Sequence, residues 1–198
     1  MYPTPGVDTA LAAANSEDVT KTALTYRDYE ALPDDGRRYE IHDGELSVTP
    51  APGSLHQIVS ANLLRALLRH VPATAPGLLL HAPLDVILAD TTIVRPDIVY
   101  LAPDRLDHVS RRGIEGAPTL AVEILSPSTQ TIDRAIKTRL YARHELPYLW
   151  LIDPEARTIE SFVLQRDRYL LDLTATGLEP VDLPPFTALD LVPDTLWP

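Results

Sequence analysis

The sequence predicts a mixed α/β fold, in which one mixed β-sheet is flanked by helices and is accompanied by additional N-terminal and C-terminal β-hairpins. Short apolar runs rich in Val, Ile and Leu, which are typical of buried strands, alternate along the chain with two longer segments of helical periodicity. Two further pairs of short segments are joined by turn-forming residues, as the strands of hairpins are. A chain of 198 residues suits one domain with extra terminal segments.

Three segments are predicted to be helices. Residues 54–71 place apolar side chains at four-residue intervals; Ser54 begins a capping-box pattern, and Pro72 is expected to end the helix. A second long helix is predicted over residues 131–144. A short helix is predicted over residues 25–32, because that segment also opens on a capping-box pattern.

The predicted strands form two hairpins and a set of central strands. The pair Asp43-Gly44 suits a type I′ turn and predicts a hairpin over residues 39–49. The alternation of residues 158–164 and 168–173 predicts the second hairpin. The central strands are predicted at residues 78–81, 84–88, 97–101, 119–125 and 148–152. We expect the first hairpin and all central strands except the first to share one sheet, covered by the two long helices.

The chain is predicted to consist of a leader over residues 1–24, a domain over residues 25–175 and a proline-rich arm over residues 176–198. It has no cysteine, which excludes disulfides, thiol catalysis and cysteine zinc sites. The N-terminus lacks the pattern of a signal peptide. No apolar run approaches the roughly 18 residues that a membrane-spanning helix needs. We therefore expect a cytoplasmic protein that does not enter membranes.

The formal net charge of −11 argues against a protein that simply coats DNA, because long-range electrostatics would repel nucleic acid. It does not exclude an enzyme that handles phosphate at a local site, since a bound divalent ion changes the field where the phosphate would lie. The net charge therefore argues against one class of DNA-binding protein but does not identify the function.

Two carboxylates occur in apolar strands. Glu123 lies in the middle of the predicted strand 119–125, where a lone buried carboxylate is costly unless it is paired, protonated or bound to a metal. Asp97 opens the next apolar strand upstream, directly after Pro96. A salt bridge would also explain Glu123, and a turn or strand-end role would explain Asp97. Together, however, carboxylates on neighbouring strands suit a hard cation such as Mg²⁺.

The second long helix carries a polar stripe, which consists of Asp133, Lys137 and Tyr141 at four-residue spacing. An apolar stripe lies beside it, formed by Ile132, Ile136 and Leu140. The polar stripe is therefore expected at the border of the buried face, where it could line a cleft. An ordinary Asp–Lys pair on the helix surface would give the same spacing.

Taken in order, these motifs resemble the Uma-type restriction endonuclease family of bacteria, within the PD-(D/E)xK nuclease superfamily. The resemblance covers roughly residues 25–175. It is carried by Arg95-Pro96-Asp97, by residues 122–129 and by the polar stripe, with further matching segments at residues 39–46, 54–57 and 149–154. The ordered series of motifs is specific, although no single motif is.

The resemblance implies a restriction-endonuclease-like core that uses Mg²⁺ or Mn²⁺. Carried over by position, Asp97 and Glu123 would be metal carboxylates, and Glu40 would be the acidic residue contributed before the core sheet. The superfamily pattern places Lys two residues after the Glu, whereas this chain has Leu125 there. The resemblance indicates Lys137, on the following helix, as the replacement.

The leading interpretation is a metal-dependent endonuclease that hydrolyses DNA phosphodiester bonds, with DNA as its partner. Glu40, Asp97 and Glu123 would hold the ion, and Lys137 would orient the attacking water or neutralise charge on the phosphate. A homodimer is compatible with the resemblance. Two alternatives stay open: a catalytically inactive nuclease-fold module for binding or interaction, and a phosphohydrolase of small nucleotides.

Weaker candidates surround this set. His56, in the first turn of the first long helix, is expected to face either the cleft or the surface. Tyr141 is expected to pack rather than react. Several arginines offer either local phosphate contacts or solvated surface charges, namely Arg111, Arg112, Arg134, Arg139 and Arg143.

Overall fold

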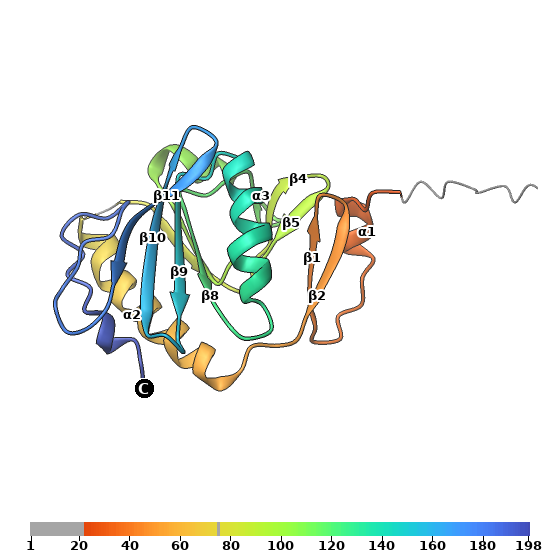
Figure 1. Cartoon of the computed structure of the whole chain (residues 1–198). Helices are drawn as coiled ribbons and strands as arrows, with labels where there is room; N and C mark the ends of the chain where they lie inside the picture. The colour runs from red at the N-terminus through yellow and green to blue at the C-terminus, as the bar shows by residue number, and fades with distance from the viewer. Residues whose placement is uncertain (1–21, 75) are drawn as a thin grey trace, which may run out of the picture.

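The computed structural model describes residues 22–74 and 76–198, which form two β-sheets with helices packed against them (Figure 1). The predicted mixed α/β fold is thus confirmed, whereas the prediction of one common sheet is wrong. The predicted leader lies almost entirely outside the described residues. Within the described ranges, no helix is both long and apolar enough to cross a membrane.

The larger sheet carries most of the predicted central strands. Its strands are β3 (Leu78–His81), β6 (Ile98–Leu101), β8 (Leu120–Ile124), β9 (Tyr148–Asp153), β10 (Thr158–Gln165) and β11 (Arg168–Ala175). They lie in the order β11-β10-β9-β8-β6-β3. β8 and β9 are parallel, and the other neighbours are antiparallel. The predicted second hairpin is present as β10 and β11, which extend this sheet beyond β9.

The smaller sheet is built around the predicted first hairpin. Its strands are β1 (Arg38–His42), β2 (Glu45–Thr49), β4 (Val86–Ala89), β5 (Thr92–Val94) and β7 (Ile114–Glu115), in the order β2-β1-β5-β4-β7. Asp43 and Gly44 have φ angles of 53° and 83°, as a type I′ turn requires, so the hairpin prediction is confirmed. β5 and β7, with three and two residues, are too short to show an alternating pattern in the sequence.

The unpredicted strand β5 explains why there are two sheets. β5 pairs with β1 on one side and with β4 on the other, so it draws both the hairpin and β4 away from the central strands. β5 ends at Val94, and Pro96, which has no backbone N–H to donate, follows in the link to β6. Because β6 begins at Ile98 in the larger sheet, Asp97 lies at the junction of the two sheets.

All three predicted helices are present: α1 (Tyr26–Glu30), α2 (Ser54–Thr74), and the consecutive η2 (Ile132–Lys137) and α3 (Thr138–Arg143). Thr25 and Asp28 form the predicted capping box of α1. α2 continues past Pro72, because the one hydrogen bond that a proline removes near a helix end does not force the remaining residues out of helical conformation. The segment η2 is π-helical. Two short 3₁₀ helices complete the set, η1 (Pro103–His108) and η3 (Pro193–Thr195).

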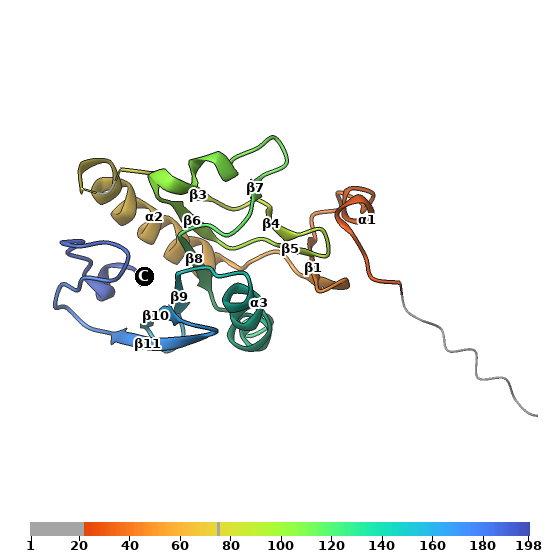
Figure 2. The same ribbon diagram turned by 90° about the horizontal axis from the view of Figure 1, so that it is seen from above.

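The larger sheet separates two apolar layers, because successive strand residues face opposite ways. On one face, Val122 and Ile124 of β8 pack with the buried side of α2. On the other face, Ala121 packs with Leu140 of α3. Figure 2 shows α2 and α3 on opposite sides of this sheet. Glu123 therefore lies on the strand face that is covered by η2 and α3.

The proline-rich C-terminal segment packs against the larger sheet on the α2 side (Figure 2). The ring of Phe186 meets the rings of Tyr100 and Trp150 edge-on, with centroid distances of 4.9 and 5.8 Å. Trp150 Nε1 donates a hydrogen bond of 2.8 Å to the carbonyl of Pro184. The segment thus supplies part of the apolar core despite having almost no regular secondary structure.

Candidate active site

Glu123 is the central carboxylate of the site. Its side chain is 1% exposed and points from β8 toward η2 and α3. Lys137 Nζ lies 3.1 Å from each carboxylate oxygen of Glu123. The hydroxyl of Tyr141 donates a hydrogen bond to Glu123 Oε1. The helix that follows β8 therefore covers the strand carboxylate with one ammonium and one phenol.

Lys137 is held by three carboxylates at once. Besides Glu123, its Nζ lies 3.0 Å from Glu40 Oε1 and 3.3 Å from Asp133 Oδ1. The Lys137 side chain is only 2% exposed. A buried ammonium needs such partners, because burial of an unpaired charge is strongly unfavourable. The position of Lys137 beside Glu123 is the one expected from the sequence.

The polar stripe is more deeply buried than the sequence suggested. Asp133, Lys137 and Tyr141 were expected at the border of the buried face, but each is buried, whereas Ile136 is 39% exposed. The border position is therefore wrong. Two physical features explain the difference: ion pairs compensate for burial of the charges, and the π-helical turn bonds residue i to i+5, so the α-helical period of 3.6 no longer decides which residues face inward.

Asp97 is fixed from the neighbouring strand. Its backbone N–H donates to the carbonyl of Val122, and its Oδ2 accepts a 2.7 Å hydrogen bond from the N–H of Ile124. These two contacts lie on either side of Glu123 in β8. His56 Nε2 of α2 lies 3.2 Å from Asp97 Oδ2, so His56 faces the site rather than the surface. Asp97 lies directly before β6, which pairs with the strand β8 that carries Glu123, so the two carboxylates are neighbours in one sheet region, as the site hypothesis required.

Glu40 reaches the site from the smaller sheet. It is 2% exposed, and its Oε1 accepts a 2.6 Å hydrogen bond from the N–H of Arg95. His42 Nε2 lies 3.3 Å from the other oxygen. Together with the Lys137 contact, these interactions hold Glu40 against the junction between the two sheets. The three carboxylates that the sequence pointed to therefore converge.

Arg38 belongs to the same cluster and was not among the predicted site residues. Its Nη1 lies 3.4 Å from Asp97 Oδ1, and its Nη2 lies 3.5 Å from Glu40 Oε1 and 3.7 Å from Glu123 Oε2. The available signal was its spacing from Glu40: residues two apart in a strand share a face. An arginine at the start of a short strand is more often a surface residue, so this spacing alone does not single Arg38 out.

The surroundings of the three carboxyl groups shift their pKa values in different directions. Burial raises the pKa of Glu123 to about 8, even though Lys137 opposes the shift. Burial also acts on Glu40, but the charges of Lys137 and Arg38 prevail and hold its pKa well below the ordinary value. The pKa of Asp97 is lowered as well, because its hydrogen bond with His56 and the charge of Arg38 outweigh burial.

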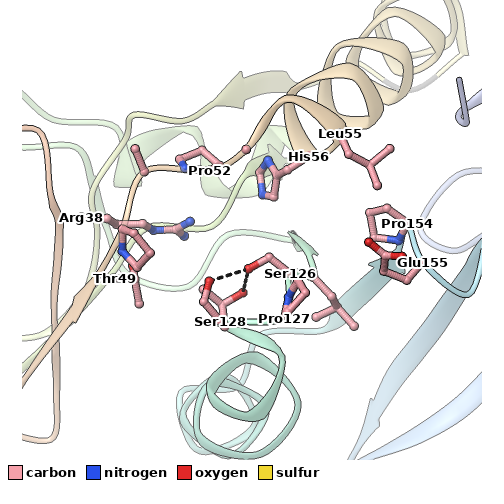
Figure 3. Close-up of a pocket in the computed structure, with 15 residues that line it drawn as sticks. Arg38, Thr49, Pro52, Leu55, His56, Ser126, Pro127, Ser128, Pro154 and Glu155 are labelled. Carbon is pink, nitrogen blue, oxygen red and sulfur yellow. Dashed lines mark hydrogen bonds between the residues drawn. The ribbon is translucent and has the colours of Figure 1, made fainter.

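Two cavities adjoin the cluster. One, of about 290 Å³, is lined by Arg38, His56, Ser126 and Ser128 among others. Figure 3 shows the guanidinium of Arg38, the imidazole of His56 and the hydrogen-bonded hydroxyls of the two serines around this opening. The second cavity, of about 690 Å³, is lined by Asp97 as well as by Arg38 and His56. Of the three carboxylates, Asp97 therefore borders a cavity directly, and Arg38 and His56 border both cavities.

The arginines that the sequence offered as phosphate contacts do not line either opening in the described part of the chain. Arg134 pairs with Glu160 and lies 3.6 Å from Asp153. Arg143 Nη1 lies 2.7 Å from Asp43 Oδ1. Such exposed ion pairs contribute little to stability, and they correspond to the interpretation of these arginines as solvated surface charges. Arg38 is the arginine that lies beside the carboxylates.

The donor chemistry of the cluster fits a hard cation, since carboxylate oxygens are the ligands that Mg²⁺ and Mn²⁺ favour. The spacing of these side chains, however, does not form a ready set of metal ligands. Among residues 22–74 and 76–198, no three His, Cys, Asp or Glu side chains are grouped closely enough to hold an ion. The side chains of Arg38 and Lys137 instead bridge the carboxylates. The residues are thus of the type that binds such a metal, but in this structure two basic side chains hold them in their arrangement.

Comparison with known proteins decides the family. The model of the Uma2 family, described as "Putative restriction endonuclease", matches residues 26–194. The chain belongs to the Uma2 family. The Uma2 chain is also similar to a solved structure described as "a putative nuclease belonging to DUF820" from Anabaena variabilis, with 21% identity, a TM-score of 0.66, and 87% of this chain and 97% of that chain covered. That likeness shows the shared fold. No curated protein matches this Uma2 chain.

The Uma2 chain departs from the PD-(D/E)xK pattern at one position. Leu125, two residues after Glu123, is 4% exposed and packs in the apolar layer beside α3. No ammonium can therefore come from the strand itself. Lys137 is the amine that the fold places at Glu123 instead.

Proposed function

We propose that this protein is a metal-dependent endonuclease that hydrolyses DNA phosphodiester bonds. The observation that carries the proposal is the convergence of Asp97, directly before β6, and Glu123, on the neighbouring strand β8, with the buried ammonium of Lys137. Membership in the Uma2 family supports a nuclease-like function.

Each member of the cluster has a role that follows from its surroundings. Asp97, Glu123 and Glu40 would hold Mg²⁺ or Mn²⁺, which when bound lowers the pKa of a water and polarises the phosphoryl group. Lys137 cannot rotate away, because three carboxylates hold its Nζ. It is therefore suited to orient the attacking water or to neutralise charge that develops on the phosphate. The backbone N–H of Ile124 fixes the orientation of Asp97.

The cavity beside the cluster supplies groups that can position a phosphate. Ser126 and Ser128 place hydroxyls 3.0 Å from each other at its rim, and Thr129 lies 3.0 Å from Ser126 Oγ. Hydroxyls commonly contact phosphate oxygens in protein–DNA complexes. With a net charge of −11, the protein must rely on such local contacts rather than on long-range attraction.

A second candidate is hydrolysis of small nucleotides. Two observations favour it: the acidic net charge, and the confined volumes, about 290 and 690 Å³, of the two cavities beside the cluster. A free nucleotide needs no extended basic surface, whereas a duplex usually does. Metal-dependent turnover of nucleotides without cleavage of DNA would favour this candidate.

The test is cleavage of supercoiled plasmid, linear duplex and single-stranded oligonucleotides in Mg²⁺, in Mn²⁺ and in EDTA. We expect cleavage only with metal, and loss of cleavage in Asp97→Asn. A matched control is Asp172→Asn, which removes the same charge at an exposed position of β11. If the wild type binds DNA but turns over neither DNA nor nucleotides, the protein is an inactive binding module and the proposal fails.

A further inference from the structure

Arg38 lies where the three carboxylates meet. Its two terminal nitrogens lie within 3.4 to 3.7 Å of oxygens from Asp97, Glu40 and Glu123. These are the same three side chains that the proposed function assigns to the metal. The guanidinium therefore lies among the oxygens that a cation would have to share.

The two basic residues of the cluster are not held alike. Lys137 is 2% exposed, and its contacts with carboxylates are 3.0 to 3.3 Å long. The Arg38 side chain is 17% exposed, and none of its contacts with carboxylates is shorter than 3.4 Å. Charge-assisted hydrogen bonds are typically about 2.7–2.9 Å long, so the contacts of Arg38 are individually weak. Lys137 is a fixed part of the cluster, whereas Arg38 is a loosely shared counter-ion.

Arg38 also has space into which it can move. It lines both cavities beside the cluster, and Figure 3 shows its side chain at the edge of the smaller one, opposite His56. An arginine side chain can change rotamer about its sp³ torsions without moving the backbone. The guanidinium can therefore leave the carboxylates and remain solvated, while β1 stays paired in the smaller sheet.

We propose that Arg38 is the resident counter-ion of the carboxylate site, which a divalent cation displaces into the adjoining cavity when it binds. This inference rests on the proposed metal site and assigns the residue that controls access to it. It also accounts for the absence of a grouped ligand set in the described residues, because the guanidinium keeps the carboxylates apart while neutralising their repulsion.

Displacement lowers the apparent affinity for the metal, because binding must first break the contacts of Arg38. Removal of the guanidinium should therefore tighten metal binding. The same change should destabilise the metal-free protein, because it leaves the buried carboxylates with Lys137 as their main counter-charge. These opposite effects on metal affinity and on metal-free stability separate displacement from a general loss of structure.

The experiment is calorimetric titration of metal-stripped protein with Mn²⁺. We expect Arg38→Met to bind Mn²⁺ at least about tenfold more tightly than the wild type, since removal of one nearby like charge is worth more than the 1.4 kcal/mol of a tenfold change. The matched control is Arg65→Met, which makes the same change at an exposed position of α2 that lines neither cavity. Its affinity should stay within about twofold, because surface charges are largely screened.

Equal or weaker Mn²⁺ binding by Arg38→Met would overturn the inference. An Asp97→Asn arm separates this failure from failure of the metal site: if the wild type binds Mn²⁺ and Asp97→Asn does not, the metal site stands and only the role of Arg38 falls. If neither the wild type nor Arg38→Met binds Mn²⁺, both proposals fall.

A second measurement does not depend on whether Arg38→Met folds. In the wild type, the guanidinium NMR signal of Arg38, assigned with the charge-preserving Arg38→Lys, should shift as Mg²⁺ saturates the site. The signal of Arg65, which lines neither cavity, should stay in place. An Arg38 signal that is unchanged at saturating Mg²⁺ would contradict displacement.

Discussion

Replacement of Lys137 by Met tests whether the buried ammonium holds the site together. The change keeps most of the aliphatic stem but leaves Glu40, Glu123 and Asp133 without their shared cation. With Lys137 only 2% exposed, we expect a large cost in stability.

The magnitude follows from the burial of the pair. Removal of one partner of a buried ion pair costs about 3–5 kcal/mol. Since about 2–4 °C corresponds to 1 kcal/mol in a domain of this size, the melting temperature in EDTA should fall by roughly 6–20 °C. The loss of stability caused by Lys137→Met should be greater at pH 9 than at pH 6. Below its pKa of about 8, Glu123 is largely neutral and loses little when the ammonium is removed; above that pKa it is charged and needs the partner.

The assay is thermal unfolding followed by circular dichroism in EDTA at both pH values. Arg139→Met is the matched control, because Arg139 is exposed on the same helix and its substitution should change stability by no more than about 0.5 kcal/mol. At a temperature where both proteins are folded, cleavage by Lys137→Met should be roughly 10²–10⁴-fold slower. A Met variant as stable as the Arg139 control would refute the buried-cluster reasoning, and near-normal cleavage would refute the catalytic role.

Three further outcomes are expected. Glu123→Gln should flatten the fall in melting temperature between pH 6 and 9 in EDTA: the raised pKa of Glu123 makes its neutral form stabilising at low pH, and that contribution is lost as pH rises through about 8. If the melting temperatures of the wild type and Glu123→Gln fall in parallel between these pH values, this role of Glu123 is wrong. Asp97→Asn should abolish any rise in melting temperature with Mn²⁺, which an unchanged rise would contradict. Phe186→Ala should cost about 3–5 kcal/mol in urea unfolding, and a near-zero cost would show that the C-terminal segment packs elsewhere.

Local signals in the sequence were reliable where the responsible interactions are local. The capping box at Thr25 and Asp28 and the type I′ turn at Asp43 and Gly44 each involve residues a few positions apart, and both are present. The partition into two sheets was missed because it depends on β5, a three-residue strand whose pairing with β1 joins segments about fifty residues apart in the chain.

The same distinction between local signals and long-range contacts applies to the candidate site. Asp97 and Glu123 could be found because a carboxylate in an apolar strand is conspicuous, and Lys137 because the resemblance pointed to it. Arg38 was missed, since a charged residue before a hairpin has the pattern of an ordinary surface residue. Its importance comes from the junction of the two sheets, which only the tertiary structure reveals.

The π-helical segment η2 also bears on how this protein could be engineered. A turn closed by i→i+5 bonds contains one residue more than an α-helical turn and is intrinsically less favourable. Shortening η2 by one exposed residue, such as Ile136, should yield a regular α-helix and raise the stability of the isolated element. Because a π-helical turn absorbs its extra residue locally, the same deletion would leave Asp133 and Tyr141 on nearly the same face but would shift Lys137 relative to Asp133. An idealised helix would therefore gain stability at the expense of activity, a trade-off between robustness and function.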